Sequence, residues 1–361
     1  MTPAPMNPAA ADWLMDNADT PIRYRTAREL LHDTKTEKAL ESELPVSPAA
    51  ALWLGNLKPD PQQPRRFAEH GSFDDCLENT LLKAVQLGLH YGMPEVRDAL
   101  SYSVSLMPQY AELPQKRRSF PAILTANLLS LIGADDEATR RYMLASLHEI
   151  HRFIREQGYN LYLNEERRAK LTGIPTCWKD RRHFIRQEIY EAYGFAYPLI
   201  YDIAGLHTLY RLRDPVIDEK IGDVLRYILT DDFHAAVADG YGILPEGNGV
   251  YHGMGWDPKC PGWFGVKDML TSNHAPKLLF HAQYAARYPA VRETRWFQDV
   301  LTCLEAYQTA PGRYAFPAKW FSEKQGYAVM GSHLSCGENR RKKNWTEIES
   351  TFAMLLLKRD L

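Results

Sequence analysis

Residues 94–107, PEVRDALSYSVSLM, and residues 120–133, FPAILTANLLSLIG, are the apolar-rich segments that decide the fold class. The first begins with proline and the second ends with glycine, residues that commonly start and stop α-helices. Residues 76–92, CLENTLLKAVQLGLHYG, also end in glycine, and residues 135–156 are acidic at their start and basic at their end, as a helix dipole favours. These segments predict consecutive helices joined by short links.

The same signals recur along the whole chain. Thr20-Pro21 and Ser47-Pro48 each predict an N-cap followed by a first-turn proline. About ten to twelve helices with short links predict antiparallel helical hairpins, whereas the alternation typical of strands is scarce. We expect a single all-α domain over residues 1–361. Further helices are expected near 184–206, 215–229, 267–288, 290–308 and 345–358.

Two longer segments interrupt the helices, at residues 239–265 and 310–344. The first holds eight of the 22 glycines of the chain, a density that argues against a stable helix or strand. Its many apolar and aromatic residues argue against disorder. In rings and solenoids of helical hairpins, long insertions gather on one face, so we expect both segments to cap a central cavity. A loop that merely covers a core is the alternative.

Composition narrows the function classes. The chain has 361 residues, 45% of them hydrophobic, and a net charge of −2 from 43 basic and 45 acidic side chains. This mixed charge argues against nucleic-acid binding. No stretch approaches the ~18 apolar residues of a membrane span, and the N-terminus has no signal-peptide pattern, so we expect a cytoplasmic protein. Five widely spaced cysteines predict reduced thiols.

Two terminal segments carry a resemblance to a known superfamily. Residues 13–31, WLMDNADTPIRYRTARELL, and 345–359, WTEIESTFAMLLLKR, resemble the first and last helices of terpenoid cyclases and protein prenyltransferases, particularly squalene-cyclase-like single-domain bacterial members. The resemblance implies an α/α toroid and an enzyme that acts on an apolar or isoprenoid-like small molecule. Asp74-Asp75 is only a fragment of the Asp-x-Asp-Asp motif of the cyclases, and Gln-Trp repeats are absent. The fold therefore carries over better than the activity.

The resemblance also implies a zinc site. The prenyltransferases of this superfamily hold zinc with an Asp and a Cys close together and a distant His, and Asp257, Cys260 and His333 match these types. The spacing is Asp-x-x-Cys here, whereas the family has Asp-x-Cys. Three such ligands leave one position open for catalysis. Without a metal, the same residues could form an acid–base site in which Asp257 orients His333.

Four tyrosines follow one another at steps of three, four and four residues from 190 to 201. On a helix these steps place all four rings on one face, and their hydroxyl groups suit a partly wet cavity wall. Packing against a neighbouring helix is the alternative. With two tryptophans of the glycine-rich segment, they supply the candidate substrate-binding residues Tyr190, Tyr193, Tyr197, Trp256 and Trp263.

Other functions use overlapping residues. A carbohydrate lyase on a helical barrel needs a group that neutralises a carboxylate and a base, which Asn273-His274 with nearby tyrosine or histidine could supply. A hydrolase needs two facing carboxylates, for which Glu246, Asp257 and Glu338 are candidates. A non-catalytic helical-repeat scaffold that binds a protein partner is the third hypothesis. The candidate catalytic residues are Asp257, His333, His252, His274 and Tyr251.

Overall fold

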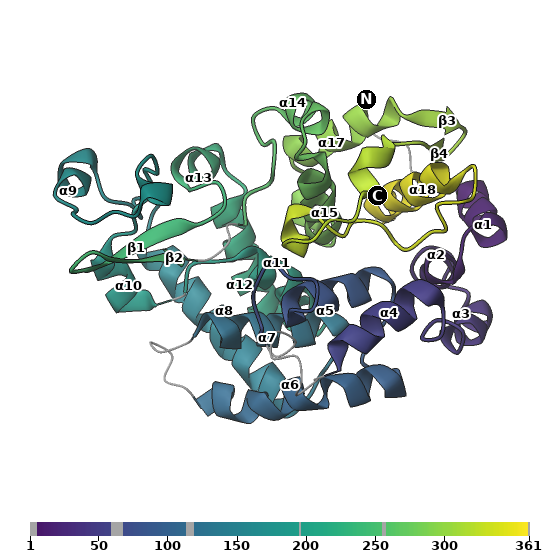
Figure 1. Ribbon diagram of the computed structural model, residues 1–361, viewed down its shortest axis with the longest axis horizontal. Helices are drawn as coiled ribbons and strands as arrows, with labels where there is room; N and C mark the ends of the chain where they lie inside the picture. The colour runs from purple at the N-terminus through teal and green to yellow at the C-terminus, as the bar shows by residue number, and fades with distance from the viewer. Residues whose placement is uncertain (1–5, 59–67, 113–118, 195, 255–257, 360–361) are drawn as a thin grey trace. The chain divides into compact units, whose positions relative to one another are not determined.

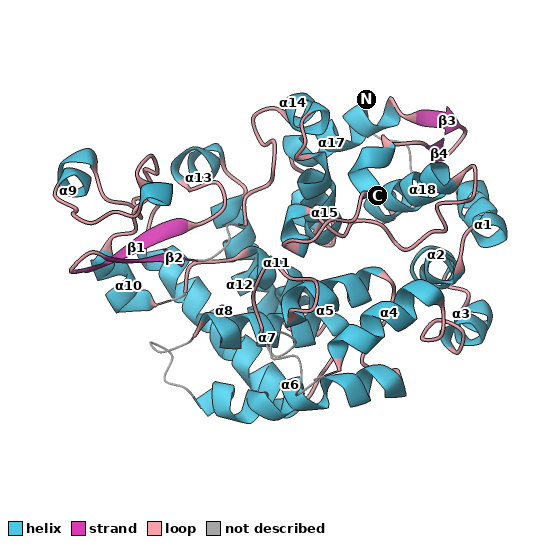
Figure 2. Ribbon diagram, in the orientation of Figure 1, coloured by secondary structure: helices cyan, strands magenta, loops and turns pink. Residues whose placement is uncertain are grey.

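The structure is a computed structural model that describes residues 6–58, 68–112, 119–194, 196–254 and 258–359 (Figure 1). The chain is mostly helical, with 60% helix and 6% strand, which confirms the predicted all-α class (Figure 2). Among the described residues, no helix is long and apolar enough to cross a membrane.

Contacts divide the chain into two compact units. Unit 1 comprises Met1–Ser105, Leu131–Ala134 and Cys260–Leu361, and unit 2 comprises Leu106–Ser130 and Asp135–Lys259. Helices α6 (Pro94–Glu112) and α7 (Phe120–Ile132) run from one unit into the other.

The other elements fall within one unit each. In unit 1 they are α1 (Pro8–Asn17), α2 (Thr20–Thr26), the π-helical turn η1 (Ala27–Leu31), α3 (Thr34–Glu41), α4 (Pro48–Leu57), α5 (Leu77–Gln86), α14 (Val266–Thr271), α15 (Ala275–Ala285), α16 (Pro289–Arg292), α17 (Arg295–Glu305), β3 (Gln308–Ala310), β4 (Arg313–Tyr314), η5 (Ala318–Phe321), η6 (Ala328–Met330) and α18 (Trp345–Lys358). In unit 2 they are α8 (Glu137–Glu156), α9 (Glu165–Ala169), η4 (Thr176–Trp178), α10 (Gln187–Tyr193), α11 (Ile200–Tyr210), α12 (Pro215–Ile228), α13 (Asp231–Ala236), β1 (Gly242–Gly247) and β2 (Val250–Met254).

Several predicted helix ends are confirmed. Helix α6 begins at Pro94, and α7 ends just before Gly133, whose φ of 88° lies in the left-handed region that favours glycine. The Asp136 side chain caps α8 by accepting a hydrogen bond from the Thr139 amide at 2.9 Å. Three longer helices predicted for 184–206, 267–288 and 290–308 are wrong in extent, because each divides into two shorter helices.

The irregular segment 310–344 of unit 1 is anchored by α18. Glu349 is 1% exposed, and its carboxylate accepts hydrogen bonds from the Ser335 hydroxyl at 2.7 Å, the Cys336 amide at 2.8 Å and the Glu338 amide at 3.1 Å. The next two residues of α18 also bind this segment. The Ser350 hydroxyl accepts a hydrogen bond from the Phe316 amide, and the Thr351 hydroxyl accepts one from the Tyr314 amide. Buried backbone N–H groups outside helices and sheets need such partners.

Helix α5 anchors the same segment through polar side chains that are almost fully buried. The Lys83 ammonium group, 1% exposed, pairs with Glu323 and donates hydrogen bonds to the carbonyl groups of His333 and Ser335. The Asn79 side chain accepts a hydrogen bond from the Ala328 amide at 2.9 Å. The segment is therefore positioned by specific polar contacts from two helices in addition to apolar packing.

Unit 2 is organised around α7, α8, α11 and α12. The buried Asp202 carboxylate accepts hydrogen bonds from the Leu199 amide at 2.9 Å and from the Asn127 amide group at 2.8 Å, which joins α11 to α7. A small β layer accompanies these helices. It consists of β1 and β2, which pair antiparallel, of residues 183–185, which join β1 through backbone hydrogen bonds, and of residues 161–163, which pair with residues 184–186.

The prediction that glycine density excludes a strand in residues 239–265 is wrong. Strands β1 and β2 form a hairpin there, visible at the left of Figure 2. Its turn contains Gly247, Asn248 and Gly249, with φ values of 91°, 51° and 76°. Glycine reaches this backbone region without steric cost and asparagine tolerates it, so the glycines supply the turn that allows the strands to pair.

We expect Glu349→Gln to lower the free energy of unfolding by about 1–3 kcal/mol, because the substituted amide presents hydrogen-bond donors to some of the N–H groups that Glu349 now accepts from. Urea unfolding checks this value. The matched control is Glu43→Gln, an exposed position of the same unit, where the change should stay within about 0.5 kcal/mol. Equal effects of the two substitutions would contradict the anchoring role of Glu349.

Candidate functional site

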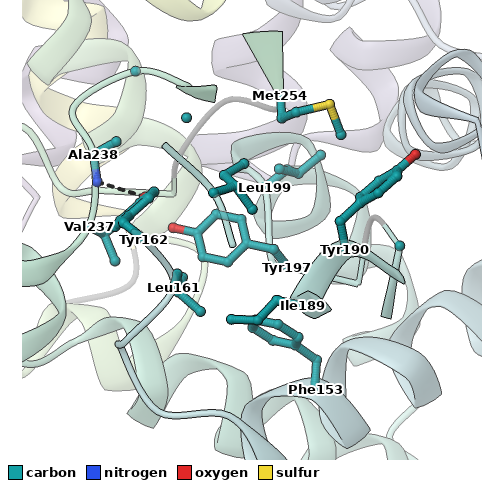
Figure 3. A pocket seen from close by; sticks show the side chains of 14 residues that line it. Phe153, Leu161, Tyr162, Ile189, Tyr190, Tyr197, Leu199, Val237, Ala238 and Met254 are labelled. Atoms are coloured by element: carbon teal, nitrogen blue, oxygen red, sulfur yellow. Dashed lines mark hydrogen bonds between the residues drawn. The ribbon is translucent and has the colours of Figure 1, made fainter. Parts of the chain in front are cut away.

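Unit 2 contains an apolar pocket with about 620 Å³ of unfilled space, its open mouth included. Its walls come from α8, α10, the β layer and the segments that flank α11 and α13 (Figure 3). The lining residues are Phe153, Leu161, Tyr162, Ile185, Ile189, Tyr190, Gly194, Tyr197, Leu199, Val237, Ala238, Gly240, Gly242 and Met254. Apart from backbone groups, the polar groups of this lining are three tyrosine hydroxyls.

The β layer fixes one wall of the pocket. The Ile185 amide donates a hydrogen bond to the Ile243 carbonyl at 2.7 Å, which holds Ile185 beside β1. A Cβ atom at Gly242 would approach the Ile185 side chain to 2.8 Å and the Tyr162 ring to 3.3 Å. A glycine at position 242 therefore lets two lining side chains pack directly over the strand.

The tyrosines of the pocket have different surroundings. The Tyr162 hydroxyl accepts a hydrogen bond from the Ala238 amide at 3.0 Å, drawn as a dashed line in Figure 3. The Tyr197 ring meets Phe153 edge to face, with centroids 6.0 Å apart. Burial raises the pKa of Tyr190, and the nearby Glu246 carboxylate raises it further. The Tyr190 phenol therefore stays protonated at neutral pH and can donate a hydrogen bond.

The prediction that the four tyrosines share one helical face is wrong. Helix α10 ends at Tyr193, because Gly194 adopts φ 58° and ψ −129°, and α11 begins only at Ile200. The break nevertheless leaves Tyr190 and Tyr197 in the lining of the same pocket. Tyr201 is buried against Phe120, with centroids 6.0 Å apart.

Tyr193, a predicted binding residue, is not among the residues that line the pocket. Its hydroxyl donates to the Glu156 carboxylate at 2.7 Å and accepts from the Gln157 amide group at 2.9 Å. Its ring packs edge to face on Phe153, with centroids 5.4 Å apart. Phe153 therefore contacts both Tyr197, which lines the pocket, and Tyr193, which does not.

Two of the three proposed zinc ligands, Cys260 and His333, lie among the described residues. Asp257 lies outside the described residues, and Cys260 is buried in unit 1. His333 is 2% exposed, and its Nε2 atom lies 3.1 Å from an oxygen of Asp74, so Asp74 is a carboxylate partner of His333. Among the residues that the structure describes, no group of three or more His, Cys, Asp or Glu side chains could hold a metal ion.

The surroundings of His333 indicate a structural role. Its ring packs edge to face on Trp53, with centroids 5.0 Å apart, and its backbone carbonyl accepts a hydrogen bond from Lys83. Burial lowers the pKa of His333, while the Asp74 carboxylate opposes this shift. The neutral, enclosed imidazole therefore helps to fix the segment 310–344 against α4 and α5.

The remaining catalytic candidates lie at the surface. His252 is half exposed on β2 and lies 3.1 Å from Glu246 across the hairpin. The Tyr251 hydroxyl donates to the Thr172 carbonyl at 2.6 Å. His274 is exposed at the start of α15 in unit 1. Tyr251 and His252 belong to unit 2, whereas His274 belongs to unit 1.

The candidate carboxylates and tryptophans belong to different units or lie outside the described residues. Glu338 is buried in unit 1, where it accepts a hydrogen bond from the Asp19 amide at 2.8 Å, whereas Glu246 belongs to unit 2. Trp256 lies outside the described residues. Trp263 stacks on Trp296 in unit 1, with centroids 6.4 Å apart.

Sequence reasoning missed most of the pocket wall. Leu161, Ile185 and Val237 come from three separated segments, and none of these segments carries a recognisable motif. Their convergence depends on the β layer, for which the sequence showed only a glycine-rich stretch. The spacing of Tyr190 and Tyr197 was the one available signal.

Comparison with protein-family models, with curated proteins and with solved structures found no match for this chain.

His234 makes the stability of unit 2 sensitive to acid. It is 4% exposed in α13, directly before the lining residues Val237 and Ala238, and burial lowers its pKa to about 3, with a further contribution from Lys259. Between the unfolded pKa of about 6.5 and this value, only the unfolded state gains the proton. Stability is therefore complete above that range and falls with decreasing pH, by about 1.4 kcal/mol per pH unit.

We expect His234→Gln to reduce this pH dependence, which urea unfolding at pH 7 and pH 5 measures. His252→Gln, at a half-exposed position in the same unit, serves as the control and should retain the wild-type slope. A His234→Gln protein with the wild-type slope would contradict the assignment.

Proposed function

We propose that the pocket of unit 2 binds a small, largely apolar molecule. The observation that carries this proposal is the lining itself: aliphatic and aromatic side chains, with tyrosine hydroxyls as the polar side-chain groups. Binding sites for small molecules are typically concave and mostly apolar, with a few placed polar groups. The lining of this pocket has the same composition.

The polar groups support a ligand with one polar end. The hydroxyls of Tyr162, Tyr190 and Tyr197 are the polar side-chain groups of the lining. The Tyr190 phenol stays protonated at neutral pH because its pKa is raised. An apolar body with a hydroxyl or carbonyl group, such as an isoprenoid alcohol, matches this combination better than a saccharide, which would bury many hydroxyls against apolar walls.

The chemistry implied by the sequence resemblance extends this proposal. A terpenoid-cyclase-like or prenyltransferase-like enzyme would hold an isoprenoid-like substrate in such a pocket. Among the described lining residues there is no Asp, Glu or His, so the pocket supports retention of a ligand better than its protonation. We therefore place ligand binding first and cyclase-type turnover second, ahead of a carbohydrate lyase or hydrolase and a protein-binding scaffold.

We also propose the closed α/α ring as the arrangement of the helical hairpins, on the strength of the two terminal segments and the mostly helical chain. A compact chain of this length should give a radius of gyration of about 21 Å in small-angle X-ray scattering. A markedly larger radius with an elongated profile would favour an open solenoid instead.

Farnesol, a neutral isoprenoid alcohol, tests the binding proposal by displacement of the neutral fluorescent dye 1-aminoanthracene. We expect saturable displacement from the wild-type protein, and Met254→Trp should weaken it by about tenfold or more because the larger side chain fills the pocket. The matched control is Leu144→Trp, at a residue 37% exposed on α8 of the same unit, which should bind as the wild type does.

A second pair of variants tests the hydroxyl groups. Tyr190→Phe should weaken farnesol binding a few-fold through loss of one hydrogen bond. Tyr193→Phe removes the same atom outside the pocket and should leave binding unchanged. Wild-type affinity in both Met254→Trp and Tyr190→Phe, with unfolding curves that show folded protein, would refute the proposal, as would preferential binding of a uronate oligosaccharide.

A further inference from the structure

A second pocket, in unit 1, is lined by three arginines and one glutamate. It contains about 380 Å³ of unfilled space, mouth included. Its charged groups come from α2, η1 and the ends of α15 and α18, and its remaining lining is apolar or neutral. The lining residues are Arg25, Glu29, Val85, Gln86, Gln283, Tyr284, Arg287, Leu356 and Arg359. The side chains of this lining therefore carry a net charge of two positive.

Arg25 and Glu29 form a rigid base for this pocket. The Arg25 guanidinium contacts both Glu29 carboxylate oxygens, at 2.6 and 3.0 Å, and donates to the Gln86 carbonyl at 2.8 Å. Its Cζ atom lies 4.9 Å from the centroid of the Phe352 ring. Because its N–H groups donate to Glu29 and Gln86 and its plane packs on the Phe352 ring, the Arg25 guanidinium is held in place without a ligand.

Glu29 is shared between two guanidinium groups. Its Oε2 atom also accepts a hydrogen bond from Arg359 at 3.1 Å. Burial raises the pKa of Glu29, but Arg25, Arg359 and Arg287 outweigh burial and lower it to about 2. Glu29 is therefore ionised at neutral pH. It is the one acidic side chain among the described residues that line this pocket.

Arg287 is the third arginine of this lining. It is partly buried, with its Cζ atom 4.9 Å from the centroid of the Tyr284 ring. Within the described part of the chain, it makes neither a hydrogen bond nor an ion pair with a carboxylate. Burial lowers the pKa of Arg287, and Arg359 and Arg25 contribute to this by repulsion. A cation in this environment is stabilised by an anion that completes the charge balance.

We propose that the pocket binds an oxyanion of the phosphate class, held by Arg287 and Arg359 beside the fixed Arg25–Glu29 pair. Planar guanidinium groups suit such oxygens because each can donate two parallel hydrogen bonds. The Glu29 and Arg359 side chains each remain 23% exposed, so the site is reachable from solvent.

Inorganic phosphate is the probe for this site, measured by titration calorimetry and by thermal unfolding at constant ionic strength, with chloride as the reference salt. We expect saturable binding and a phosphate-dependent rise in Tm. Arg287→Gln should weaken phosphate binding by about tenfold or more, since it removes a charged hydrogen-bond donor. Without phosphate, the variant should be no less stable than the wild type, because repulsion among the arginines is relieved.

Arg295→Gln is the matched control, since its side chain is 95% exposed on α17 of the same unit, and it should bind phosphate as the wild type does. Absence of saturable phosphate binding, or equal binding by Arg287→Gln, would overturn the proposal. Asp360 follows Arg359 in the sequence and provides a further test. If phosphate binds only to the Asp360→Asn variant, the chain's own carboxylate is the anion of the pocket and the proposal of an external ligand fails.

Discussion

The three hydrogen bonds that the Glu349 carboxylate accepts from residues 335–338 hold together the least regular part of unit 1. An irregular segment cannot satisfy its own buried N–H and carbonyl groups, so neighbouring side chains must do so. Lys83 supplies the complementary cation and donates to carbonyl groups of the same segment. This constraint explains why α5 and α18 bury charged and polar residues at positions where apolar ones would serve an ordinary helix pair.

The anchored segment also determines the surroundings of other groups. It places His333 against Trp53, and it brings the Cys336 sulfur to 3.9 Å from the Arg25 guanidinium at the base of the arginine-lined pocket. Burial raises the pKa of Cys336 to about 12, with the Glu349 carboxylate adding to the effect, so this thiol stays protonated. Cys336 is therefore an inert packing group next to a cation.

The two pockets differ in the chemistry of their linings, and the two proposed ligands would be recognised in opposite ways. In unit 2, the β layer and α10 surround a volume with apolar side chains, and affinity would come from burial of apolar surface with tyrosine hydroxyls fixing orientation. In unit 1, Arg25, Arg287 and Arg359 surround a volume with charge, and affinity would come from charge-assisted hydrogen bonds. The lining residues of each pocket belong to a single unit.

The sequence by itself determined the helical class and many helix ends, because proline, glycine and capping residues act within a turn of their position: Pro94, Gly133 and Asp136 are examples. It also singled out Tyr190 and Tyr197, although for a helical face that Gly194 interrupts. Only the tertiary structure decided that a glycine-rich stretch forms a hairpin, that the pocket wall includes Leu161 and Ile185, and that the imidazole of His333 meets Asp74. These outcomes depend on pairings between residues far apart in the chain, and local composition carries no information on which partner a buried polar group or an unpaired strand will find.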